Sequence, residues 1–97
     1  MPKGYWVKIY RKISDPKKLA AYAELAPKAT APFGCKYLAR GDAAQAYEAG
    51  IKQRIVIVEF ESVAKAVEAH DSPDYQIALK ALDGGVERDL RIVEGLE

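Results

Sequence analysis

The stretch RIVIVEFES, from Arg54 to Ser62, decides the fold of this chain. Successive side chains of a strand point to opposite faces of a sheet, so a strand with one wet face alternates apolar and polar residues. Here both faces are apolar: Ile55 and Ile57 share one, and Val56, Val58 and Phe60 share the other. One layer of helices covers one face of a sheet, so the second face needs a different cover.

Three more segments have the composition of strands. They are rich in β-branched and aromatic residues or alternate in polarity, as strands do. The predicted strands are Tyr5–Ile13, Lys36–Arg40 and Asp89–Glu94. In the first of them, Trp6, Lys8 and Tyr10 fall on one face.

Helix signals lie between these strands. Asp15 is a predicted N-cap with Pro16 at the first helical position, and Pro27 either kinks or ends the helix that follows. Ser62 caps a second helix, whose apolar face includes His70. Ser72 and Pro73 start a third helix, which Gly84 and Gly85 end. The residues from 41 to 50 fit a capped helix or a hairpin arm, and we expect a short hairpin arm.

The order strand, helix, two strands, helices, strand predicts an α+β fold of the ferredoxin-like βαββαβ type over residues 1–97. In this plan an antiparallel sheet carries its helices on one face. We expect the open face to hold the second apolar set of the central strand together with Trp6 and Tyr10. A patch of this size marks an interface, so we predict a homodimer through the open sheet face. The alternative is a monomer whose extra loop folds over that face.

Composition excludes several classes of function. A chain of 97 residues forms one domain, and its net charge of +1 argues against nucleic acid as a partner. We see neither a signal peptide nor a stretch of about 20 apolar residues, so we expect a cytoplasmic protein that is not bound to a membrane. One Cys and one His predict no metal site, and the lack of a glycine-rich phosphate loop predicts no cofactor.

Several short motifs resemble one known family. MPKGYW, FGCKYLARGD, RIVIVEFES, DSPDYQIAL and RIVEG occur along nearly the whole chain. In this order they resemble the domain-of-unknown-function family 1330 of the dimeric α/β-barrel superfamily. The resemblance implies a ferredoxin-like protomer and a barrel formed by the sheets of two protomers.

Four side chains are candidate ligand-binding residues. Arg40 can hold a carboxylate through two hydrogen bonds, and its alternative role is an ion pair with Glu59. His70 is the candidate proton carrier, and its alternative role is packing in the core with a hydrogen-bond partner. Tyr75 and Trp6 are predicted to line the walls, although a tyrosine on the inner face of a helix is more often a packing residue than a catalytic one. The site would bind or convert a small, partly apolar organic acid; the alternative is a non-catalytic module for ligand sensing or assembly.

Overall fold

The computed structural model describes residues 2–96 and has the predicted βαββαβ order, with two helices in the second crossover. The strands pair antiparallel in the order β2-β3-β1-β4, which is the ferredoxin-like arrangement. The elements are β1 (Gly4–Ile13), α1 (Pro16–Thr30), a 3₁₀ turn (Ala31–Phe33), β2 (Lys36–Asp42), β3 (Arg54–Phe60), α2 (Val63–Asp71), α3 (Pro73–Leu82) and β4 (Val86–Glu94).

The helix caps act as the sequence indicates. The Asp15 carboxylate accepts hydrogen bonds from the backbone N–H groups of Lys17 and Lys18 at the start of α1. Ser72 separates α2 from α3, since its hydroxyl donates to the carbonyl of Ala69 and accepts from the N–H of Tyr75. Pro27 does not end α1, which continues to Thr30.

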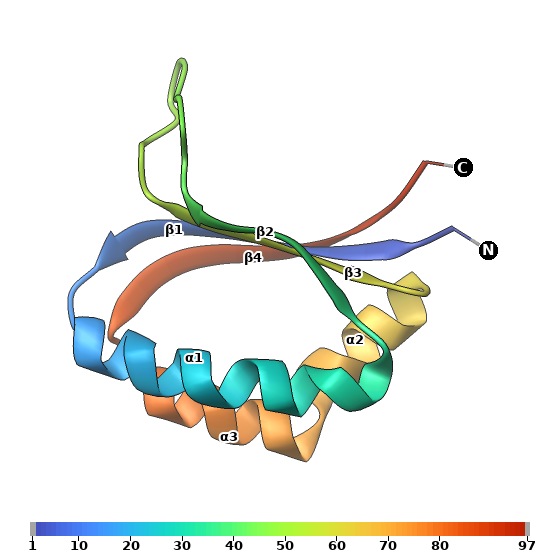
Figure 1. Ribbon diagram of the computed structural model, residues 1–97. Coiled ribbons are helices and arrows are strands. Elements are labelled where there is room, and N and C mark those ends of the chain that lie inside the picture. The colour runs from blue at the N-terminus through green and yellow to red at the C-terminus, as the bar shows by residue number, and fades with distance from the viewer. Residues whose placement is uncertain (1, 97) are drawn as a thin grey trace.

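All three helices lie on one face of the sheet (Figure 1). The covered face is opposite to the one we predicted. Trp6, Tyr10, Val56, Val58 and Phe60 are buried beneath the helices instead of lying on the open face. The reason is volume: the helices present mainly alanine to the sheet, so the large side chains that fill the layer come from the strands.

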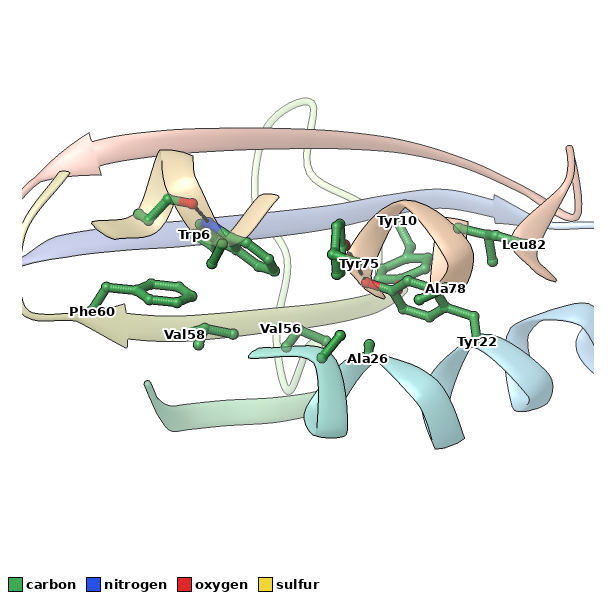
Figure 2. Packing of buried hydrophobic residues seen from close by; sticks show 13 residues of the cluster. Trp6, Tyr10, Tyr22, Ala26, Val56, Val58, Phe60, Tyr75, Ala78 and Leu82 are labelled. Carbon is green, nitrogen blue, oxygen red and sulfur yellow. Dashed lines mark hydrogen bonds between the residues drawn. The ribbon is translucent and has the colours of Figure 1, made fainter. Parts of the chain in front are cut away.

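The core is therefore a set of aromatic rings between strands and small helical residues (Figure 2). Trp6 stacks near Phe60 and Tyr75, with ring centroids 5.0 and 4.8 Å away, and its indole N–H donates to the carbonyl of Ala66. The alanines beneath these rings are Ala26, Ala29, Ala66, Ala69 and Ala78.

The open face carries the other set of side chains. Val7 pairs with Ile57 and Ile9 pairs with Ile55 across β1 and β3, and Tyr5 pairs with Val93 of β4. Ile9 and Val93 are exposed, and Val7, Ile55 and Ile57 are half-buried. The centre of this face is apolar as well, with Glu59, Asp89 and Arg91 beside it, so the argument from two apolar faces holds there with the residues exchanged.

The β2–β3 connection, residues 43–53, forms the expected arm but contains no strand. It projects away from the sheet on the side opposite to the helices (Figure 1). Its apolar side chains Tyr47 and Ile51 are exposed, so the arm does not fold over the open face.

Two strands are longer than predicted. β2 continues to Asp42, and β4 begins at Val86, three residues before Asp89. The first residues of β4 were not predicted as strand because they lack an apolar alternation. Glu87 and Arg88 nevertheless pair with Lys12 and Tyr10 of β1.

Because the face with Val58 is buried and the face with Val93 is open, aspartate substitutions at these two valines should affect stability differently. Val58→Asp places a carboxylate in the core, at a cost of several kcal/mol that is comparable with a total stability of about 5–15 kcal/mol. We expect this variant to lose its cooperative thermal transition in circular dichroism. Val93→Asp changes an exposed valine of the open face and should keep the transition. A folded Val58→Asp variant would contradict the assignment of the faces.

Candidate functional site

A cavity lies between α1 and strands β1, β2 and β3. Its volume is about 20 Å³, which is room for about one water molecule with the side chains as they stand. The lining residues are Lys8, Tyr10, Tyr22, Ala23, Ala26, Pro27, Tyr37, Arg40, Arg54 and Val56.

Lys8 is the buried cation of this cavity. It belongs to the helix-facing side of β1, between Trp6 and Tyr10, and only 2% of its surface is exposed. Its ammonium nitrogen donates to the Tyr22 hydroxyl at 3.2 Å. The same nitrogen lies 5.4 to 5.9 Å from the ring centroids of Trp6, Tyr22 and Tyr37, where the aromatic faces attract a cation.

Three arginines surround Lys8. Arg88 of β4 donates to the hydroxyl groups of Tyr10, Tyr22 and Tyr75 at 3.0 to 3.2 Å. Arg54 of β3 has its Nε atom buried without a hydrogen-bond partner. The guanidinium of Arg40 lies over the Tyr37 ring, 4.9 Å from its centroid.

No carboxylate pairs with these four cations within the described residues 2–96. The ion pairs in that part of the chain lie elsewhere: Lys18–Asp83, Lys65–Glu68, His70–Asp71 and Arg91–Asp89. A buried cation without a counter-charge is costly, and a guanidinium N–H that is hidden from water and unpaired adds to that cost. The cavity therefore has the electrostatic character of a site for an anion.

The surroundings change the acidity of Lys8. Burial is the main cause, and the charges of Arg88, Arg54 and Arg40 add to it; together they lower the pKa of Lys8 from 10.5 to about 7. Cys35 opposes this effect weakly. Near neutral pH, Lys8 therefore exists as a mixture of neutral amine and ammonium ion.

The tyrosines around Lys8 remain protonated. Burial, followed by the neighbouring Tyr75, raises the pKa of Tyr22, and burial also raises the pKa of Tyr75. The two hydroxyl oxygens lie 2.5 Å apart (Figure 2), and both accept hydrogen bonds from Arg88. Lys8, Tyr22 and Tyr75 thus form a continuous hydrogen-bonded chain.

A β-bulge brings Arg40 to this side of the sheet. Residues 37 and 40 of a regular strand point to opposite faces, because their separation is odd. The register between β2 and β3 shifts between Tyr37 and Ala39, so that Tyr37 pairs with Val58 and Arg40 pairs with Val56. Both partners face the helices, and Arg40 consequently reaches the cavity.

The predicted site residues fall into separate places. Arg40 lines the cavity, and Tyr75 contacts it through the Tyr22 hydroxyl. Trp6 does not line the cavity; it is fully buried and its polar atom is satisfied.

His70 does not line the cavity either. One third of its side chain is exposed, its Nδ1 atom lies 3.2 Å from the Asp71 carboxylate, and its ring packs against Trp6 and Tyr75. The alternative ion pair of Arg40 with Glu59 is absent: Glu59 accepts from the Tyr5 hydroxyl and pairs with Lys36 in the β2–β3 register, on the open face.

Sequence reasoning missed Lys8, Tyr22, Arg54 and Arg88. A usable signal was present for Lys8, which has the same parity as Trp6 and Tyr10 in β1. Once the side of β1 with Trp6 and Tyr10 is assigned to the face that the helices cover, Lys8 is predicted to be buried. Arg88 gave no such signal, because it lies in the part of β4 that lacks an apolar pattern.

Two further searches were negative for the described chain. Within residues 2–96, no helix combines the length and apolarity that a membrane crossing requires. In the same range, no three His, Cys, Asp or Glu side chains gather closely enough to hold a metal ion.

Comparison with known proteins identifies relatives of uncharacterised function. The model of the domain of unknown function DUF1330 matches residues 3–96. A search of the curated proteins finds no match.

Three solved structures share the fold. A protein of unknown function from Rhodopseudomonas palustris has a TM-score of 0.78 at 19% identity, over 99% of this chain and 84% of that one. A dimeric ferredoxin-like protein of unknown function from Thermobifida fusca has a TM-score of 0.67 at 17% identity, over 96% and 91%. SnoaB, a cofactor-independent oxygenase from Streptomyces nogalater, has a TM-score of 0.67 at 9% identity, over 100% and 96%.

The lowered pKa of Lys8 predicts a pH-dependent stability. Between pH 7 and 10.5 the unfolded chain holds a proton on Lys8 that the folded chain has released. The free energy of unfolding therefore rises with pH through this window, by at most about 1.4 kcal/mol per pH unit. Lys8→Met removes this contribution.

The measurement is urea unfolding of wild type and Lys8→Met at pH values from about 7 to about 9, where unfolded tyrosines, with a pKa of about 10, stay largely protonated. We expect Lys8→Met to be relatively most stabilising at the low end, and its advantage to shrink as pH rises. Lys12→Met, at an exposed position of the same strand, should give a flat difference. A flat difference for Lys8→Met as well would contradict a lowered pKa.

Proposed function

This chain belongs to the DUF1330 family, and we propose that it is a homodimer that binds a small, partly apolar organic anion in the Lys8 cavity. The observation that supports anion binding most directly is the set of cations Lys8, Arg40 and Arg54, which line one cavity and have no carboxylate partner among residues 2–96. A carboxylate ligand would supply the missing counter-charge and an acceptor for the unpaired Nε of Arg54.

The walls of the cavity favour a ligand with an apolar part. Tyr10, Tyr37, Ala26 and Val56 present rings and methyl groups beside the cations. This combination of apolar walls and a few convergent polar groups is typical of small-molecule sites. A large polyanion such as nucleic acid would not enter so small a space.

Arg40 is the side chain best able to open the cavity. It is exposed, and it is held by stacking on Tyr37, with no hydrogen bond or ion pair to other residues in the described range. The present volume of about 20 Å³ accommodates about one water molecule, so a carboxylic acid of several atoms requires this side chain to move outward to the mouth of the cavity, where its guanidinium can still contact the bound carboxylate. In this proposal Arg40 keeps its predicted role, and Lys8 takes the proton-carrying role that sequence reasoning gave to His70.

The homodimer is supported by the open sheet face and by structural relatives. Val7, Ile9, Ile55, Ile57 and Val93 leave an apolar surface on the side without helices. Contiguous apolar surface of this kind marks an interface, and at least one protein of the same fold is described as dimeric. The projecting arm of residues 43–53 lies on the same side as this face (Figure 1).

Enzymatic conversion and ligand sensing both remain within this proposal. The same fold is found in a cofactor-independent oxygenase, so the architecture permits chemistry without a bound cofactor. A sensing module would need only the binding step. Turnover of a bound acid separates the two.

Anion binding is tested by calorimetric titration and thermal shift with a panel of small carboxylates, including oxalate and benzoate. Arg54→Gln removes a charge-assisted hydrogen bond, so we expect binding about tenfold or more weaker. Arg11→Gln removes the same charge at an exposed position outside the cavity and should leave affinity unchanged. Equal weakening by both variants would show a general charge effect and contradict the site.

The dimer is tested by light scattering at micromolar concentration. Ile57→Asp puts a carboxylate in the middle of the open face, so we expect the mass of a monomer. Ile77→Asp is the matched control, because Ile77 is exposed on the helical side, on α3. A wild-type mass of one chain would contradict the dimer, as would a dimeric Ile57→Asp variant.

A further inference from the structure

The Lys8 amine is placed so that a ligand of the cavity meets it. Lys8 is a lining residue, and its nitrogen is 3.2 Å from the hydroxyl of Tyr22, which also lines the cavity. Within residues 2–96 this nitrogen makes no other hydrogen bond, and the aromatic rings of Trp6, Tyr22 and Tyr37 lie around it. The amine is thus shielded from bulk water, and a ligand that enters the cavity once Arg40 has moved outward meets it.

The chemical state of this amine is unusual for a lysine. Burial and three arginines lower its pKa to about 7, so a large fraction carries a free electron pair at neutral pH. A neutral amine is a nucleophile towards carbonyl carbon, and desolvation next to other cations is a known way to activate lysine. An amine with the ordinary lysine pKa of about 10.4 would be almost fully protonated at the same pH.

We propose that Lys8 condenses with the carbonyl group of a small 2-oxo or aldehyde acid whose carboxylate is held by Arg54 and Arg40. This inference rests on the proposed function and names its substrate class. The small cavity supports it, because the amine and the two guanidinium groups line one space. A 2-oxo acid, which has its carbonyl group directly beside its carboxylate, is the shortest ligand of this class that can present one group to the amine and the other to the guanidinium groups.

The condensation needs no other reactant. The Lys8 nitrogen forms a bond to the carbonyl carbon, and the carbonyl oxygen takes up a proton to give a carbinolamine. The C–O bond then breaks, and the oxygen leaves as water with the two protons that the amine has lost. Tyr22 is the positioned proton donor, since it contacts the Lys8 nitrogen and stays protonated, and Tyr75 can reprotonate it across their short hydrogen bond.

Reductive trapping with glyoxylate tests the inference. Glyoxylate is the smallest acid of this class, which suits the small cavity. Wild-type protein is incubated with glyoxylate and cyanoborohydride at neutral pH, and modified lysines are located by peptide mass spectrometry. We expect one adduct per chain at Lys8, with the mass of glyoxylic acid less one oxygen atom, at an occupancy at least tenfold above that of any other lysine.

Three controls make the result specific: a competing anion, a pair of arginine variants and the loss of Lys8 itself. Oxalate carries the carboxylate but has no reactive carbonyl group, so an excess of oxalate should suppress the Lys8 adduct. Arg54→Gln should reduce labelling of Lys8, whereas Arg11→Gln should not. Lys8→Met should lose the adduct without a new one elsewhere, and peptide mapping of the wild type gives the answer even if that variant folds poorly.

The outcomes distinguish the inference from the function on which it rests. Oxalate binding without a Lys8 adduct would overturn the condensation and leave anion binding intact. Labelling spread evenly over the lysines would also overturn it. Absence of oxalate, benzoate and glyoxylate binding, by titration and thermal shift, would remove the proposed anion site itself.

Discussion

The structure depends on one constraint: a lysine lies on the buried side of the central strand β1, and no carboxylate of the described chain pairs with it. Lys8 lies between Trp6 and Tyr10, whose rings fill the layer beneath the helices. Burying an ammonium ion is expensive, and the protein reduces the cost by favouring the neutral amine and by surrounding it with aromatic faces and a tyrosine hydroxyl. Three arginines near the same point increase the cost, which a structural role alone does not explain.

The rest of the cavity follows from this arrangement. Alanines on α1, α2 and α3 let the helices approach closely, and the large residues of the sheet fill the space between the layers. The bulge in β2 orients Arg40 towards the cavity. Arg88 donates hydrogen bonds to the hydroxyl groups of three tyrosines. Polar groups are thus concentrated at one point of an otherwise apolar layer, as in sites that bind small ligands.

Much of the fold could be predicted from sequence, because caps, prolines and strand alternation are local signals. The order of elements and the break at Ser72 followed from such signals. The assignment of the two faces did not, since Ile55 and Ile57 are as apolar as Val56 and Val58. The two faces can be distinguished only by the volumes of the side chains. Helices that present alanines leave space above the sheet, and the face of β1 and β3 that carries the aromatic residues fills that space.

The site was less predictable than the fold. Arg40 was identified from its position at the end of an apolar segment. Its orientation depends on a β-bulge, and the sequence of β2 contains no signal that predicts this bulge. The alternation of β1 puts Lys8 on the same side as Trp6 and Tyr10. Because we predicted this side to be the open face, Lys8 was expected to be exposed to water. Arg54, Arg88 and Tyr22 come together only through pairing of distant strands and docking of α1, which are non-local events.

Nuclear magnetic resonance titration of the lysine side chains, followed through the ¹³Cε and attached protons, tests the central claim most directly. We predict that the Lys8 signal titrates with a pKa of about 7, well below the ordinary lysine value of about 10.4. Arg54→Gln removes one of the neighbouring charges, so the Lys8 pKa should rise in that variant. A Lys8 pKa near about 10.4 in the wild type would contradict the account.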